Sequence, residues 1–192
     1  MTAGSIGYDR GRLIGLLQRD ALKRGTFTLA SGRTSHYYVD GRKVTLSAAG
    51  AALIGAGVLE RLAAYPDVRA VGGLTMGADP IVGATLALAG LADRPEIRGF
   101  LVRKEAKTHG TGNRVEGPLE PDTTVAILDD VATTGGSSLQ AVDAVEAMGC
   151  RVAVVIVVLD RLEGAAATFR NRGLPFESLL TIRDLGVEPA AG

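Results

Sequence analysis

The chain has 192 residues, and its 21 basic and 21 acidic side chains give a formal net charge of zero. A chain of this length fits one domain with a substantial core, and its balanced charge argues against a nucleic-acid partner. Cys150 is the single cysteine, which excludes an intramolecular disulfide and leads us to expect a buried thiol in a cytoplasmic protein. No apolar run approaches the roughly eighteen residues of a spanning helix, and the amino terminus does not have the order of a secretion signal, so we expect no membrane association.

Two helices are predicted in the first third of the chain. Asp9 can cap a helix that runs to about Lys23, where Gly25 can end it. Ser47 can cap a second helix over residues 48–64, in which apolar residues recur at helical spacing. The apolar face of the first helix consists of Leu13, Leu16, Leu17 and Ala21.

Strands and helices alternate in the rest of the chain. Strands are predicted at about 70–73, 97–102, 123–128 and 152–159, with helices at about 79–90 and 137–148. This alternation predicts an α/β fold with a central, mostly parallel sheet flanked by helices. Residues 26–46 do not fit the alternation and are expected to form short strands that make a small amino-terminal hood. We expect residues 1–192 to form a single domain.

The segment Val125–Ser138 places two adjacent carboxylates after an apolar strand. The strand should deliver Asp129 and Asp130 to the carboxyl edge of the sheet, where open α/β folds bind ligands. The small residues that follow, 133–138, offer backbone N–H groups and hydroxyls at a helix N-terminus, which suits a phosphate. The carboxylates suit ribose hydroxyls or a hydrated divalent cation. Taken separately, the acids could belong to an ordinary loop, and the small residues to an ordinary strand-to-helix turn. Their order favours a phosphoribosyl site.

A second segment, 103–117, is expected to form a mobile catalytic loop. It holds two lysines, two arginines, one histidine and three glycines, and almost nothing apolar that could fix it to a core. Such a stretch alone could be a solvated surface loop. It starts, however, at the end of a predicted strand, at the same sheet edge as the acids, and its positive charge complements a diphosphate. These two features favour the catalytic interpretation.

Several segments carry a family resemblance. Residues 125–138 are similar to the 5-phosphoribosyl 1-diphosphate (PRPP) signature of type I phosphoribosyltransferases, with apolar residues, two acids and T-T-G-G-S. Phe27–Tyr38 resembles the F-x-L-x-S-G-x-x-S-x-Y segment of the orotate phosphoribosyltransferase family, and Leu159–Arg161 supplies an L-D-R match. The R-K-x-x-K-x-H-G loop pattern of that family is met by Arg103, Lys104, Lys107, His109 and Gly110. The chain therefore resembles this family from about residue 26 to residue 161.

The resemblance implies the type I phosphoribosyltransferase fold and a reaction in which orotate displaces diphosphate from PRPP, giving orotidine 5′-monophosphate in de novo UMP synthesis. It implies Mg²⁺ as cofactor, held mainly by PRPP and water rather than directly by the protein. The implied catalytic residues, which clamp the diphosphate, are Arg103, Lys104, Lys107 and His109, with Lys107 the main candidate for transition-state stabilisation. Together with these four, the implied PRPP-binding residues are Asp129, Asp130, Val131, Ala132, Thr133, Thr134, Gly135, Gly136 and Ser137.

The resemblance assigns orotate to Thr133 and Arg161, although Arg161 could instead serve only in a salt bridge. Tyr37 and Tyr38 could stack on the base or fill the small core of the hood, and we expect at least one to be core. The resemblance also implies a homodimer in which the loop of one subunit reaches the active site of the other.

Two positions depart from the pattern of many family members. Ala30 and Met76 stand where those members carry lysines, so backbone groups near residues 73–77 and the loop cations would bear more of the binding.

Three other functions compete with this one. They are a phosphoribosyltransferase for a purine or uracil, a PRPP-sensing regulator of transcription, and a PRPP synthase-like diphosphokinase. The L-D-R arginine and the loop pattern argue against the first. The neutral charge argues against the second, and the absence of a recognisable ATP motif argues against the third.

Overall fold

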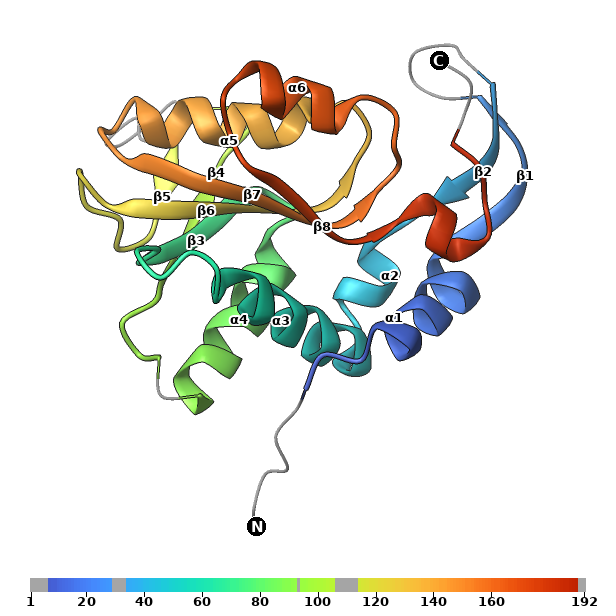
Figure 1. The fold of residues 1–192 in the computed structure, drawn as a ribbon, viewed down its shortest axis with the longest axis horizontal. Coiled ribbons are helices and arrows are strands. Elements are labelled where there is room, and N and C mark those ends of the chain that lie inside the picture. Colours follow the sequence, from blue (N-terminus) through green and yellow to red (C-terminus); the bar gives the residue numbers. More distant parts are fainter. Residues whose placement is uncertain (1–6, 29–33, 93, 106–113, 190–192) are drawn as a thin grey trace.

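The structure is a computed structural model that describes residues 7–28, 34–92, 94–105 and 114–189. Within these residues, a six-stranded sheet in the order β5-β4-β3-β6-β7-β8 forms the centre of the molecule (Figure 1). Every neighbouring pair is parallel except β4 and β5, which are antiparallel. The predicted α/β class with a mostly parallel sheet is confirmed. The strands are β3 (Ala70–Leu74), β4 (Arg98–Val102), β5 (Val115–Glu116), β6 (Thr124–Ala132), β7 (Arg151–Asp160) and β8 (Phe176–Thr181).

Helices cover both faces of this sheet (Figure 1). One face carries α5 (Gly136–Glu146) and α6 (Ala165–Asn171), and the other carries α3 (Ala48–Leu62) and α4 (Asp79–Leu91). The buried side chains of β6 alternate between the two layers: Ala126 and Leu128 join the core on the α3 and α4 side, whereas Val125 and Ile127 join the core on the α5 side. This alternation explains why the strand is apolar throughout.

The amino-terminal helix is shorter than predicted. Asp9 caps α1 (Arg10–Leu16) by accepting a hydrogen bond from the Arg12 N–H at 2.9 Å. A single π-helical turn, η1 (Leu17–Ala21), follows, and strand β1 begins directly after it. The prediction of helix to Lys23 and a stop at Gly25 was wrong because this stretch pairs with β2 instead. The predicted apolar face is confirmed, since Leu13, Leu16, Leu17 and Ala21 are all buried.

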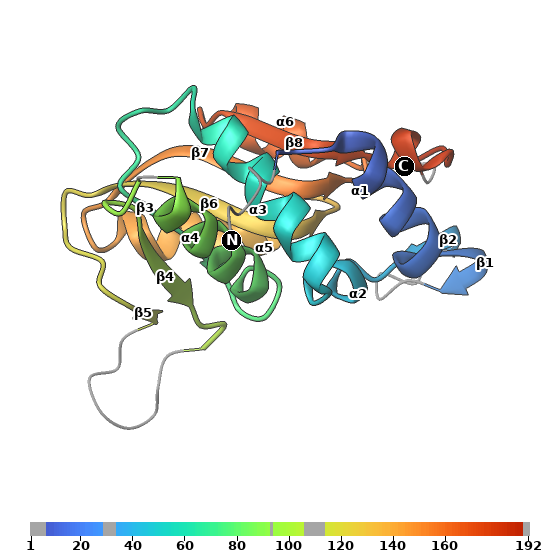
Figure 2. The same ribbon diagram turned by 90° about the horizontal axis from the view of Figure 1, so that it is seen from below.

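The hood contains a two-stranded antiparallel sheet made of β1 (Leu22–Thr28) and β2 (Thr34–Val39), so its strands start at Leu22, earlier than residue 26. The short helix α2 (Arg42–Thr45) then leads to α3, whose cap Ser47 accepts a hydrogen bond from the Gly50 N–H at 3.1 Å. The ribbon seen from below places the hood and the β4–β5 pair at opposite ends of the molecule (Figure 2).

Residues early in the chain contact a 3₁₀ turn late in the chain, η2 (Ile182–Leu185). Arg10 forms a 2.7 Å ion pair with Asp184, and the Gln18 amide donates a hydrogen bond to the Leu185 carbonyl at 3.2 Å. The Arg24 guanidinium donates to the Gly186 carbonyl at 3.1 Å. The hood is therefore fastened to the last element after the sheet.

Cys150 is buried, with 6% of its surface exposed, and burial raises the pKa of its thiol above the usual value. The prediction of a buried thiol is confirmed. Among the helices of the described segments, none combines the length and the apolar character needed to cross a membrane.

Candidate functional site

The acidic pair lies where β6 extends beyond its neighbour β3. Pairing with β3 ends at Ile127, whereas pairing with β7 continues to Ala132. The strand therefore runs past Leu128, its predicted end, because β7 offers partners to Asp129, Val131 and Ala132. Asp129 and Asp130 lie on a strand that is open on one side, at the carboxyl edge of the sheet.

Asp129 is a fixed hydrogen-bond acceptor at this edge. Only 4% of its surface is exposed, and its Oδ2 accepts hydrogen bonds from the hydroxyls of Ser137 at 2.6 Å and Ser138 at 2.8 Å. Its Oδ1 accepts from the Asp130 N–H at 3.0 Å. These bonds fasten the first turn of α5 to β6 and orient the carboxylate.

The ionised form of Asp130 is disfavoured by its surroundings, which include Asp129. Burial, together with the negative charge of Asp129, raises the pKa of Asp130 from 3.8 to about 6. Its Oδ1 accepts a hydrogen bond from the Val131 N–H at 2.9 Å, which offsets only part of this effect. Ribose hydroxyls or a cation near the pair would favour its fully ionised state.

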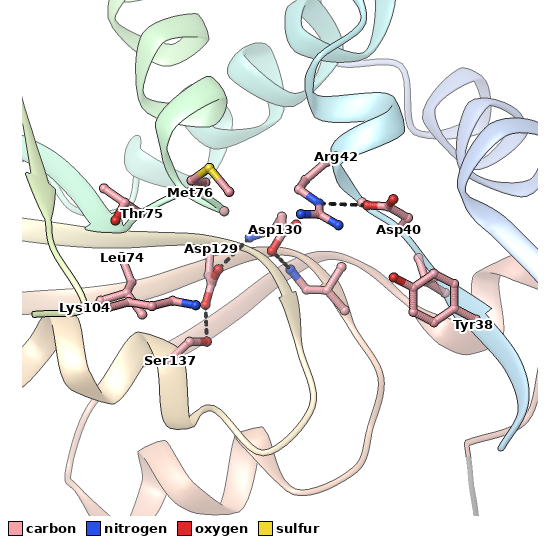
Figure 3. A pocket seen from close by; sticks show the side chains of 14 residues that line it. Tyr38, Asp40, Arg42, Leu74, Thr75, Met76, Lys104, Asp129, Asp130 and Ser137 are labelled. Carbon is pink, nitrogen blue, oxygen red and sulfur yellow. Dashed lines mark hydrogen bonds and ion pairs between the residues drawn. The ribbon is translucent and has the colours of Figure 1, made fainter. Parts of the chain in front are cut away.

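A cavity of about 300 Å³ opens above the acidic pair (Figure 3). Three segments wall it: the end of the hood, the turn between β3 and α4, and the end of β4. The residues that line it are Tyr38, Val39, Asp40, Gly41, Arg42, Leu74, Thr75, Met76, Gly77, Lys104, Asp129, Asp130, Val131 and Ser137.

Glycine is needed where backbone approaches the acids. A Cβ atom on Gly77 would come within 2.9 Å of Oδ1 of both Asp129 and Asp130. The turn that contains Gly77 also has a cis peptide bond between Thr75 and Met76, and Met76 is 69% exposed. The end of β3 and this turn contribute Leu74, Thr75, Met76 and Gly77 to the wall of the cavity, and none of them carries a charge.

The N-terminus of α5 follows the acidic pair directly, as predicted. Its cap residue Gly135 has a φ of 84°, and a Cβ there would approach the Phe169 ring to 2.8 Å, so a side chain is excluded on two grounds. No side chain of the described residues caps this helix, which leaves its first N–H groups available to an anion. Of the predicted phosphate-binding residues, Ser137 lines the cavity, and residues 133–136 join it to the end of β6.

Arg161 is held from two sides immediately after β7. Only 8% of its surface is exposed, and its guanidinium lies 4.9 Å from the centre of the Tyr37 ring. Its Nε donates to the Tyr37 hydroxyl at 3.3 Å, and its Nη2 lies 2.8 Å from Glu163 Oε1 without the alignment of a hydrogen bond. The Tyr37 hydroxyl donates to Glu163 at 2.8 Å. Tyr37 is buried, which confirms that at least one hood tyrosine is core, whereas Tyr38 is 39% exposed and lines the cavity.

Of the predicted loop cations, the structure describes Arg103 and Lys104, and these two lie in different places at the end of β4. Lys104 lines the cavity, and Figure 3 shows its side chain directed toward the acidic pair. Arg103 lies outside that cavity and forms a 3.0 Å ion pair with Glu116. Lys107 and His109 lie outside the described residues, as does Ala30. The base of the loop is a strand pair, since the Arg103 N–H donates to the Arg114 carbonyl at 2.8 Å.

Three residues near the site are not among those predicted from the sequence. Asp40 and Arg42 line the cavity from the hood, and Glu163 contacts Arg161. Glu163 follows the L-D-R match by two positions, which is a usable signal. Asp40 and Arg42 have no comparable motif, and only the fold brings them to the acids.

Known proteins resemble the chain over nearly its full length. The orotate phosphoribosyltransferase of Rhodopirellula baltica is 47% identical and covers 98% of this chain and 100% of its own length. The orotate phosphoribosyltransferase of Thermosynechococcus vestitus is 48% identical over 94% of this chain and 95% of its own. This chain belongs to the orotate phosphoribosyltransferase family.

A solved structure supports the same assignment. Mycobacterium tuberculosis orotate phosphoribosyltransferase in complex with PRPP is 40% identical, with a TM-score of 0.79, and covers 93% of this chain and 99% of its own. A scan against protein-family models finds no match. The predicted orotate phosphoribosyltransferase family, its type I fold and its enzymatic nature are confirmed.

Proposed function

We propose that this chain transfers the 5-phosphoribosyl group of PRPP to a ring nitrogen of orotate, giving orotidine 5′-monophosphate and diphosphate in de novo UMP synthesis. The observation that carries the proposal is the open acidic pair beside an uncapped helix N-terminus, at the carboxyl edge of the sheet, in a member of this family.

The acidic pair orients the ribose of PRPP. Asp129 is locked by two serine hydroxyls, so it cannot swing away from the ribose hydroxyls. Asp130 is only partly buried and reaches the same cavity. The 5′-phosphate would sit on the N-terminus of α5, at residues 133–137, where N–H groups and the helix dipole favour an anion.

The leaving diphosphate needs positive charge. As the bond to the anomeric carbon loosens, negative charge gathers on the diphosphate, and a preorganised cation in a water-poor site contributes about 3–4 kcal/mol. We assign this role to Arg103, Lys104, Lys107 and His109. The position of Lys104 in the cavity supports its assignment, and Arg103 would first have to exchange its partner Glu116.

Mg²⁺ would supply further positive charge to the diphosphate. Oxygen ligands suit this cation, and the carboxylates of Asp129 and Asp130 are the matching groups in the cavity. In the described part of the chain, no group of three or more His, Cys, Asp or Glu side chains is placed to hold a metal ion. We therefore propose that PRPP and water provide most of the ligands, with the acidic pair acting through water.

Arg161 and Thr133 would bind orotate. The guanidinium of Arg161 uses Nε on Tyr37, and its Nη2 is buried without an aligned hydrogen bond. A carboxylate that approaches the edge formed by the two Nη groups would accept a pair of hydrogen bonds from them. Such a site favours orotate over uracil, which has no carboxylate, and over purines.

We further propose a homodimer in which the loop 103–117 of one subunit reaches the active site of the other, while Lys104, at the base of the loop, lies in the cavity of its own subunit. The position of Arg103 outside its own cavity supports this arrangement. A cytoplasmic location stays a prediction that rests on the single free thiol.

An absorbance assay tests the function. The protein is mixed with PRPP, Mg²⁺ and orotate, and the loss of the ultraviolet absorbance of orotate is followed. We expect turnover with orotate and none with uracil, hypoxanthine or adenine. Turnover with one of these bases and silence with orotate would assign the chain another base, and binding of PRPP without turnover of any base would favour a regulator.

A further inference from the structure

We propose that Arg42 is a further binding residue for the diphosphate group of PRPP, on the hood side of the cavity. The inference rests on the proposed function and adds to it a cation that the loop pattern does not contain. Arg42 begins α2 and lines the cavity together with Asp130 and Lys104. Figure 3 shows its side chain extending from α2 toward Asp130.

The backbone of Arg42 is fixed beside the acids. Gly41 packs so closely that a Cβ atom there would lie 3.0 Å from Val131 Cγ2 and 3.1 Å from Asp130 Oδ2. The Gly41 carbonyl accepts hydrogen bonds from the N–H groups of Val44 and Thr45, both at 2.9 Å. The Asp40 N–H donates to the Ala21 carbonyl at 3.1 Å. Arg42 therefore starts from a rigid point at the rim of the cavity.

The guanidinium is oriented and keeps donors available. Its Nε donates to Asp40 Oδ1 at 3.0 Å, which raises the pKa of the arginine and fixes the plane of the group. In the residues that the structure describes, this is the hydrogen bond that the side chain makes, so the fork formed by the two Nη groups is available. About half of the side chain is exposed, at 49%. A fork of this kind matches two phosphate oxygens.

The charge of the cavity also favours a second cation. Asp129 and Asp130 repel a diphosphate placed above them, and the opposite turn presents Met76, which carries no charge. Lys104 and Arg42 are the cations that line the cavity in the described segments, and Figure 3 shows them on different sides of the acidic pair. A diphosphate between them would meet positive charge from both sides.

Calorimetry with two ligands tests the proposal. Binding of diphosphate and of ribose 5-phosphate, which has no diphosphate, is measured with Mg²⁺ for the wild type and for Arg42→Gln. We expect the affinity for diphosphate to fall by about tenfold, the typical effect of losing a charged hydrogen bond, while that for ribose 5-phosphate changes by less than about twofold. The KM for PRPP should rise by a similar factor.

Arg19→Gln is the control, because Arg19 is also an exposed arginine paired with a nearby acid, Asp20, through Nε at 2.8 Å and Nη2 at 2.6 Å, and it does not line the cavity. It should bind both ligands as the wild type does. Arg42→Lys keeps the charge without the fork, and it replaces Arg42→Gln if that variant does not fold. Unchanged diphosphate affinity, or an equal loss for both ligands, would overturn the role of Arg42. A wild type that binds no PRPP would instead overturn the proposed function.

Discussion

At the scale of single residues, the ionised carboxylate of Asp130 lowers the stability of the fold but is needed to bind the ribose. Its pKa of about 6 means that the fold favours the neutral carboxyl, whereas ribose binding needs the carboxylate. An acid whose pKa is raised by folding lowers the free energy of unfolding as the pH rises through that pKa. The ligand-free protein therefore loses stability between about pH 4 and pH 6 because of this group, and PRPP affinity should weaken below about pH 6.

Asp130→Asn removes the buried negative charge that destabilises the fold. At pH 7.5 we expect the variant to gain about 1–3 kcal/mol in free energy of unfolding and to lose PRPP affinity. Denaturant unfolding measures the gain, which should vanish below about pH 4, where Asp130 is protonated in both states. The exposed Asp67→Asn is the control and should change neither property. A variant less stable than the wild type at pH 7.5 would contradict the argument.

Glu163 is expected to be essential for the stability of the Arg161 cluster. Because both side chains are nearly buried, at 10% and 2% exposure, Glu163→Gln leaves a buried arginine without its countercharge and should lower the free energy of unfolding by about 3–5 kcal/mol. Tyr37→Phe removes only hydrogen bonds and should cost about 1 kcal/mol. Thermal and denaturant unfolding of both variants tests whether Glu163→Gln lowers the free energy of unfolding more than Tyr37→Phe does. Equal costs would show that the charge of Glu163 adds nothing.

Residues of the site are predictable from the sequence only where a local motif carries them. Asp129, Asp130 and the turn after them form one segment, and the structure places that segment as one unit. Tyr37 and Glu163 are 126 positions apart, and their contact depends on how the hood packs against the end of β7. Arg42 reaches the cavity for the same reason. No spacing in the sequence specifies such contacts.

At the scale of elements, the local sequence is enough to predict the bounds of helices and strands that have strong apolar periodicity. Helix α4, predicted at 79–90, spans Asp79–Leu91, and β7, predicted at 152–159, spans Arg151–Asp160. Strand β8 and helix α6 are not among the predicted elements. The sequence of β8, F-E-S-L-L-T, has weak alternation and becomes a strand because β7 offers it a parallel partner.

The close contact of β3 with β6 gives an element-scale prediction. A Cβ atom on Gly73 would collide with the Leu128 carbonyl and lie 2.8 Å from Ala78 Cβ, so Gly73→Ala should cost about 3 kcal/mol of stability. A Cβ atom on Gly83 in α4 would have no neighbour within 4 Å, so Gly83→Ala should gain about 0.5–1 kcal/mol. Denaturant unfolding of the pair tests the contrast. A Gly73→Ala variant as stable as Gly83→Ala would refute the tight approach of the two strands.

At the scale of the whole molecule, the shared site predicts complementation. Lys107→Ala chains and Asp129→Asn, Asp130→Asn chains should each be nearly inactive. Mixed dimers restore one intact site, which combines a good loop with a good acidic pair, so up to about half of the sites per mixed dimer should work. Differently tagged subunits allow verified mixed dimers to be purified and assayed. No recovery in these dimers would show that each loop serves its own subunit.

The contacts of Arg10, Gln18 and Arg24 with the turn at 182–186 restrict the order in which the protein can fold during synthesis. On the ribosome, the first helix and the hood emerge long before the partners that hold them. The contacts of Arg10, Gln18 and Arg24 with this turn can form only after residues 182–186 have left the exit tunnel, although α1 also packs against the early helix α3. Docking of the hood is therefore a late step of biogenesis, and the tyrosine beneath Arg161 reaches its place with it.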